Sequence, residues 1–249
     1  MFNKKIDFIQ KEKRCIFKIN NFLDQEVYNQ LENNFPDIDT KKIDLNKSFG
    51  KKFIDNEDPN LDLQNQSTIL QKFDDLIKSK TFFDFFSKKL YFYAAFTQNN
   101  ILRRIKYLRY PISNKGSDNK IMDILFSKLK VGYDYSFIKN KGEIVPHVDA
   151  QRKYLSLMLY FPKKNKADKN YGTTFWDCDE KNYSNEHLED LEKNSSFKKK
   201  YKELYKTTFE PNCLYGFIRN DISWHSVEPR DISDDYLRRS ININFYYIN

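Results

Sequence analysis

Pro146-His147-Val148-Asp149 is the stretch around which the rest of this sequence can be interpreted. In a β-strand, residues i and i+2 project to the same side, so the His147 imidazole and the Asp149 carboxylate can be directed at one point. A third ligand has to come from a distant strand. The chain contains 3 histidines, and His187 lies in a charged stretch, so we expect His225 to supply it.

Two imidazoles and one carboxylate on one face of a metal, with the other positions open, form the site that holds non-haem Fe(II) for oxygen chemistry. The open positions leave room for a bidentate cosubstrate and dioxygen. A His-x-Asp tripeptide on its own is common, and a strand histidine is more often an ordinary core or surface residue. The hypothesis therefore depends on the surrounding sequence.

Several elements surround this motif in a characteristic order. They are Tyr133 and Tyr135 in a strand, a turn at Lys141-Gly142-Glu143, an apolar strand at 155–161, Gly172-Thr173-Thr174-Phe175-Trp176, the run 209–217 before His225, and Arg238-Arg239-Ser240-Ile241. This order resembles that of the Fe(II)/2-oxoglutarate-dependent oxygenases, in particular the prolyl-hydroxylase-like branch.

The resemblance implies a mainly β protein with supporting helices and a double-stranded β-helix core of the jelly-roll or cupin-like kind. We expect one domain over residues 1–249. Residues 1–127 would supply supporting helices and strands, and residues 128–249 the core, with an inserted segment at about 177–208. A chain of this length can bury a core of that size.

The resemblance also implies roles for individual residues. His147, Asp149 and His225 would ligate Fe(II), and 2-oxoglutarate would chelate the metal as cosubstrate, with ascorbate as a supporting reductant. Tyr160, at the end of the strand after the His-x-Asp turn, would hydrogen-bond the far carboxylate of 2-oxoglutarate. The alternative for Tyr160 is an ordinary tyrosine of the barrel.

An arginine suits that far carboxylate because a planar guanidinium can donate two parallel hydrogen bonds to it. Arg238 and Arg239 are adjacent, so they face opposite sides of a strand and only one can serve. The family's Arg-x-Ser pattern favours Arg238 with Ser240. Apolar alternation favours Arg239, which shares a face with an apolar set, unless that face lies under helices and Asn242 and Asn244 line the cavity. The apolar set is Ile241, Ile243 and Phe245.

Composition favours a compact enzyme. Aromatic residues make up 16% of the chain, far more than a disordered chain carries, and the 6 glycines form no phosphate-binding loop. The formal net charge of +8 could indicate an anionic partner. The lysines are dispersed among acidic residues, however, so we do not expect a nucleic-acid partner.

The three cysteines, Cys15, Cys178 and Cys213, are odd in number and widely spaced, which favours reduced thiols over a disulfide framework. No signal peptide and no membrane-spanning run are evident. We therefore expect a cytoplasmic protein with no membrane partner.

The first half shows an alternating strand at 15–20 and a helix that begins at Asp24 and ends before Pro36. Residues 37–65 predict a long surface loop. Residues 67–90 predict helix, with aromatic stripes that pack against a sheet. Residues 101–110 predict a strand and 111–119 a turn, while 121–129 fit a short helix or a strand.

The insertion at 177–208 predicts one or two amphipathic helices, over 186–193 and 197–205. They would form either a lid at the substrate entrance or a cover for the sheet.

The implied reaction is hydroxylation of a C–H bond of a small-molecule or peptide substrate, such as a free or peptidyl amino acid, by dioxygen, with succinate and CO2 as coproducts. Asp149 disfavours halogenation, because halogenases of this family lack the carboxylate ligand. Two alternatives remain open: a nucleic-acid demethylase of the same superfamily, and a cupin-like metal-binding protein that is not an oxygenase.

Overall fold

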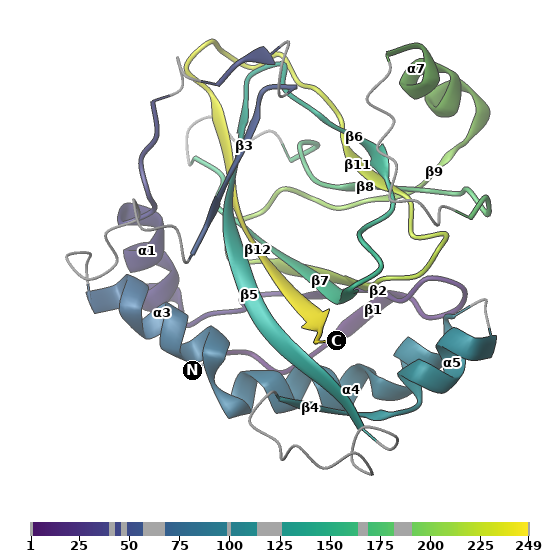
Figure 1. The fold of residues 1–249 in the computed structure, drawn as a ribbon. Coiled ribbons are helices and arrows are strands. Elements are labelled where there is room, and N and C mark those ends of the chain that lie inside the picture. Colours follow the sequence, from purple (N-terminus) through teal and green to yellow (C-terminus); the bar gives the residue numbers. More distant parts are fainter. Residues whose placement is uncertain are drawn as a thin grey trace.

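Two sheets face each other, and residues of both line a cavity between them. Helices cover the outer face of the larger sheet (Figure 1). The computed structural model describes residues 2–39, 43–45, 49–56, 68–98, 101–113, 126–163, 169–181 and 191–248.

Within these residues the larger sheet has 8 strands. Their spatial order is β1 (Asp7–Gln10), β2 (Ile16–Ile19), β10 (Leu214–Ile218), β7 (Lys153–Tyr160), β12 (Leu237–Tyr247), β5 (Phe126–Lys139) and β3 (Lys51–Asp55), with β4 (Tyr110–Ser113) also paired to β5. The smaller sheet runs β6 (Ile144–His147), β11 (His225–Val227), β8 (Thr174–Trp176) and β9 (Glu203–Lys206).

The path of the chain between the sheets identifies the fold. From β5 onward, strands β5, β7, β10 and β12 are central neighbours in the larger sheet, while β6, β8, β9 and β11 make up the smaller one. Eight strands wound in this way between two sheets form a jelly roll, here a double-stranded β-helix. The predicted fold class, a mainly β protein with a double-stranded β-helix core, is confirmed, and the first strand of that core begins at Phe126.

The helix layer is built from α1 (Gln25–Asn33), α3 (Thr68–Lys78), α4 (Lys80–Phe96) and α5 (Ile101–Tyr107). The rings of Phe82, Phe83 and Phe86 lie 6.1, 5.9 and 6.1 Å from the ring of Phe245 on β12. The apolar face of β12 is therefore buried under helices, which leaves its alternate residues to face the cavity.

The helix predicted for 67–90 is confirmed from Thr68 onward, but it is two helices. Ser79 separates them: its hydroxyl accepts a hydrogen bond from the Phe82 amide at 3.1 Å and caps α4. Asp24 occupies the N-cap position of α1 without a side-chain cap bond. The strand predicted at 15–20 is confirmed as β2.

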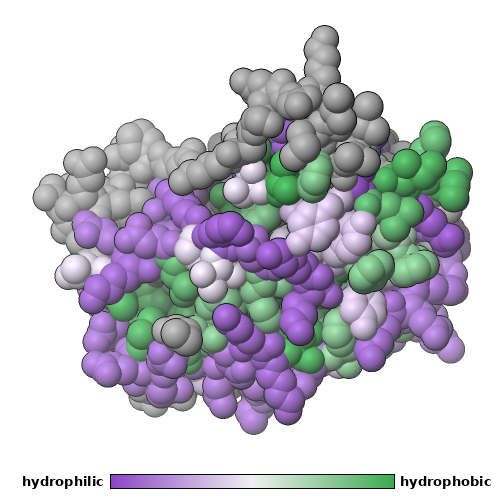
Figure 2. All heavy atoms as spheres, turned by 90° about the horizontal axis from the view of Figure 1, so that it is seen from below, coloured by the Kyte–Doolittle hydropathy of each residue, from purple (hydrophilic) through white to green (hydrophobic). Residues whose placement is uncertain are grey.

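The prediction of a strand over 101–110 was wrong, because Ile101–Tyr107 form helix α5. The apolar residues that suggested a strand are exposed: Ile101, Leu102, Ile105 and Leu108. Figure 2 shows apolar side chains gathered at this end of the helix layer. Apolar residues on a surface helix carry no reliable strand signal.

Three further segments differ from the predictions. Residues 51–55, predicted as loop, form β3 at the edge of the larger sheet, where a polar strand is tolerated. Residues 110–113, partly predicted as turn, form β4. Residues 203–206, predicted as helix, form β9. The helix predicted for 197–205 is instead α7 (Leu191–Lys200).

The helix predicted for 186–193 lies mostly outside the described residues, as do 57–65 of the predicted loop, 114–119 of the predicted turn and 121–125. Within the described residues, no helix has the length and apolar character needed to cross a bilayer.

Candidate metal centre and cavity

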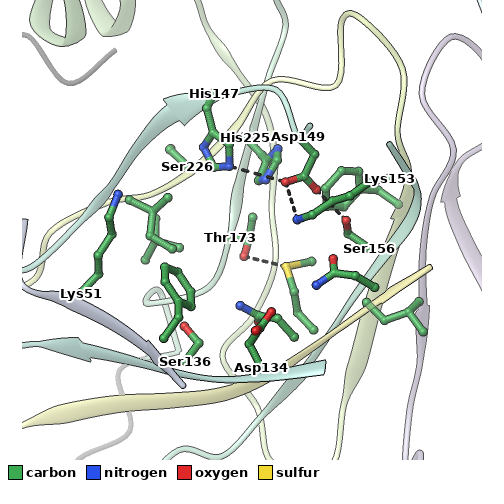
Figure 3. A pocket seen from close by; sticks show the side chains of 18 of the residues that line it. Lys51, Asp134, Ser136, His147, Asp149, Lys153, Ser156, Thr173, His225 and Ser226 are labelled. Carbon is green, nitrogen blue, oxygen red and sulfur yellow. Dashed lines mark hydrogen bonds and ion pairs between the residues drawn. The ribbon is translucent and has the colours of Figure 1, made fainter. Parts of the chain in front are cut away.

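The three predicted metal ligands meet at one end of the cavity (Figure 3). His147 ends β6 and His225 begins β11, and the two residues are direct cross-strand partners with ring centroids 4.2 Å apart. Asp149 follows two residues after His147, and its Oδ1 lies 3.8 Å from His147 Nε2. One ligand atom from each of the three buried residues lies within 4.8 Å of the others.

Backbone carbonyls orient both imidazoles. His147 Nδ1 lies 2.9 Å from the Val145 carbonyl oxygen, and His225 Nδ1 lies 2.9 Å from the Ser223 carbonyl oxygen. A carbonyl oxygen only accepts, so each Nδ1 is the nitrogen that donates, and Nε2 is the ring nitrogen left to bind a metal. Metal-binding histidines are commonly fixed in this way.

The Asp149 carboxylate is held by two neighbouring side chains of β7. Ser156 donates a hydrogen bond to Oδ2 at 2.6 Å, and Lys153 Nζ lies 2.7 Å from Oδ1. Burial opposes ionisation of Asp149, but Lys153, His225 and His147 together hold its pKa well below the usual range. Asp149 is therefore an anion whose position is fixed before any metal binds.

This donor set fits a metal ion. Two neutral nitrogens and one carboxylate oxygen on one side of a point are the donors of facial Fe(II) sites. The backbone of the site is also anchored, because Arg219 Nε donates to the Asp149 carbonyl at 3.0 Å while its Nη1 lies 2.7 Å from Asp221. The cavity beside the three ligands leaves space for further metal ligands.

The structure separates the two adjacent arginines. Arg238 lines the cavity and is 2% exposed. Its Nε donates to the Tyr171 carbonyl at 2.7 Å, and its Nη1 lies 3.4 Å from Ser240 Oγ. Arg239 faces the helix layer, where it lies 3.9 Å from Glu32 and over the ring of Phe35.

Arg238 differs from the two other fully buried arginines in lacking a counter-ion. Arg14 pairs with Asp179 at 3.1 Å, and Arg219 pairs with Asp221 at 2.7 Å. No carboxylate among the described residues pairs with Arg238, whose guanidinium instead lies 4.9–5.7 Å from aromatic ring centres. These rings belong to Tyr160, Tyr171 and Phe209.

Tyr160 lies behind Arg238. Its hydroxyl is hydrogen-bonded to the hydroxyls of Thr173 and Thr207, each at 2.9 Å, and its ring lies 5.1 Å from the guanidinium carbon. The structure thus places Tyr160 as a wall of the arginine site. A direct hydrogen bond from its hydroxyl to a bound carboxylate stays a prediction.

The cavity has a volume of about 300 Å³, at the small end for ligand sites. Sequence reasoning did not single out several lining residues, among them Lys51, Asp134, Lys153 and Ser156. A signal for one of them was present, since Asp134 alternates with the buried Tyr133 and Tyr135 and so had to point away from the core. Asn242 and Asn244 line the cavity, as expected if the apolar face of β12 lies under helices.

No protein-family model matches this sequence, and no curated protein matches it either. Similar solved structures include a Pseudomonas putida prolyl-4-hydroxylase, with TM-score 0.42, 10% identity and coverage of 93% of this chain and 91% of that one. The non-haem α-ketoglutarate-dependent epimerase SnoN has TM-score 0.44, 10% identity and coverage of 93% and 78%. A prolyl hydroxylase from Trichoplax adhaerens, in complex with a hypoxia inducible factor peptide fragment, has TM-score 0.40 and 11% identity. The similarity covers 93% of this chain and 83% of that one. Such distant similarity carries no functional argument, which has to come from the residues themselves.

Proposed function

We propose that this protein is a non-haem Fe(II)- and 2-oxoglutarate-dependent oxygenase that hydroxylates a C–H bond of a small-molecule or peptide substrate. The observation that carries the proposal is the pairing of two features in one cavity. A buried His147, Asp149 and His225 group lies at one side, and a buried Arg238 without a carboxylate partner among the described residues also lines the cavity.

A buried guanidinium without a counter-ion is costly, so a cavity that contains one favours an anionic ligand. Arg238 Nη2 has no hydrogen-bond partner among the described residues, while Nε is fixed by the Tyr171 carbonyl. The far carboxylate of 2-oxoglutarate would accept hydrogen bonds from this guanidinium. The other end of the cosubstrate would then face the metal ligands.

Bound Fe(II) would supply the oxidative chemistry: dioxygen gives one oxygen atom to the substrate hydroxyl and one to succinate, as 2-oxoglutarate loses CO2. The chain's residues would perform the remaining tasks. His147, Asp149 and His225 hold the metal, Arg238 orients the cosubstrate, and the apolar walls exclude water. These walls include Met158, Phe217 and Val227.

The adjacent arginines give a matched test. We expect Arg238→Gln to raise the Kd for 2-oxoglutarate by about 10-fold or more, because it removes the positive charge that we propose binds the far carboxylate of 2-oxoglutarate. Arg239→Gln, which removes the same charge from the opposite face, should change Kd by about 2-fold at most. Calorimetric titration of 2-oxoglutarate into the Mn(II)-loaded protein measures both values.

Equal effects of the two substitutions would contradict the proposed role of Arg238. Metal binding without any 2-oxoglutarate binding would instead favour a cupin-like metal protein that is not an oxygenase.

A further inference from the structure

The floor of the cavity, opposite the metal ligands, is polar. Asp134 on β5 is the direct cross-strand partner of Asn242 on β12, and Asn244, two residues further, is the partner of Ser156 on β7. All four residues line the cavity. Figure 3 shows Asp134 on the far side of the cavity from His147 and the other metal ligands.

Asn244 is buried, at 3% exposure, yet its amide makes no hydrogen bond within the described residues. The amide atoms of Asn244 are therefore open to the cavity that the residue lines. A ligand there could bind them, since this amide can both donate and accept.

Asp134 likewise has no hydrogen-bond or ion-pair partner for its carboxylate among the residues that the structure describes, and the nearby Lys153 is engaged by Asp149. Its cross-strand partner on β3 is Asp55, and like charges directly opposite each other are destabilising. Burial and then Asp55 raise the pKa of Asp134 to about 6, although the charge of Lys153 acts in the opposite direction. A bound cation would offset both the burial of the Asp134 carboxylate and its repulsion by Asp55.

We propose that Asp134 and Asn244 bind the cationic end of the substrate, an ammonium or guanidinium group of a basic amino-acid side chain. The carboxylate accepts N–H bonds from the cation, and the Asn244 amide oxygen accepts another. The cavity is small, so only one such side chain fits beside a cosubstrate. Calling this ligand the substrate rests on the proposed function, whereas the cation site itself does not.

The side chain could belong to a free amino acid or to a peptide, and the probes distinguish these sources. We would titrate L-arginine and L-lysine, with L-citrulline and L-norleucine as uncharged counterparts, into the Mn(II)- and 2-oxoglutarate-loaded protein. A second series uses capped tripeptides with arginine or citrulline at the centre. Both series are repeated without metal and cosubstrate.

We expect a basic probe from one source to bind at least about 10-fold more tightly than its uncharged counterpart. Asp134→Asn, which preserves the shape of the side chain, should abolish this preference. Asp55→Asn is the matched control, because it removes the same charge directly opposite Asp134 but does not line the cavity that contains the metal ligands. It should keep the preference.

Absence of any preference for basic probes in both series overturns the cation site, as does a preference that persists in Asp134→Asn. If 2-oxoglutarate binds in such an experiment, the proposed oxygenase remains and the substrate assignment alone fails. If 2-oxoglutarate does not bind but the Asp134-dependent preference is seen, the cation site stands and the oxygenase assignment fails.

Discussion

The candidate metal site depends on residues that do not themselves supply its ligand atoms. Ser156 lies seven residues after Asp149, on β7, and its 2.6 Å hydrogen bond fixes one carboxylate oxygen while Lys153 neutralises the other. Residues that orient metal ligands in this way contribute substantially to metal affinity. Ser156 is therefore a positioning residue.

Removal of the Ser156 hydroxyl provides a direct test at the residue scale. We expect Ser156→Ala to raise the Kd for Co(II) by about 10-fold, because Asp149 loses a hydrogen bond that orients it. The Co(II) absorption spectrum measures both affinity and coordination. Ser136 lines the same cavity with a hydroxyl that has no hydrogen-bond partner, so Ser136→Ala should leave the Kd and spectrum nearly unchanged. The positioning role of Ser156 is contradicted if Ser156→Ala, like Ser136→Ala, keeps the Kd for Co(II) and the spectrum of the parent protein.

The choice between Arg238 and Arg239 shows what a sequence cannot decide at this scale. Successive side chains of a strand face opposite sides, so the two arginines must point in opposite directions. Both sides of β12 are largely buried, however, so burial does not distinguish them. The face with Ile241 and Phe245 could have been inside the barrel or under helices. Only the contacts of Phe245 with α4 resolve this, and they depend on residues more than a hundred positions away.

At the scale of elements, the connection into β8 packs closely against a neighbouring segment. A Cβ on Gly172 would collide with the carbonyl oxygen and side chain of Thr207, where backbone has no room to move. This close approach also places Tyr171, whose carbonyl accepts from Arg238 Nε. The glycine therefore links strand packing to the arginine site.

We expect Gly172→Ala to destabilise the protein by about 1–3 kcal/mol, through overpacking against a backbone that cannot shift. Gly132→Ala, in the middle of β5, is the control, because its Cβ would meet only the Tyr246 ring at 3.9 Å. Its effect should lie within about 0.5 kcal/mol. Urea unfolding measures the free energy of unfolding of both variants. Equal values for Gly172→Ala and Gly132→Ala would contradict the packing argument.

Elements of the core could be predicted because each carries its own motif, whereas edge elements could not. β7 and β10 are rich in apolar residues and buried along nearly their whole length, which is typical of central strands. β3 reads Lys-Lys-Phe-Ile-Asp and has a polar pattern because it is an edge strand beside the cavity mouth. α5 exposes its apolar residues, so nothing in its periodicity identified it as a helix.

At the scale of the whole molecule, the order of motifs predicted the two-sheet topology, since strands that alternate between sheets place distant motifs together. The convergence of the candidate ligands His147 and His225 was predictable for this reason, because β6 and β11 are neighbours in such a fold. The polar floor of Asp134 and Asn244 was harder to predict. It follows from the register of β5, β12 and β7, which one sequence does not specify.

The central claim is that one cavity holds a metal on His147, Asp149 and His225 and presents Arg238 to 2-oxoglutarate. Anaerobic addition of Fe(II) and then 2-oxoglutarate to the purified protein tests it most directly. We predict a weak visible charge-transfer band that saturates at one equivalent of Fe(II), and its loss in a folded Asp149→Asn variant. A parent protein that shows no band, or a band unchanged in Asp149→Asn, would contradict the account.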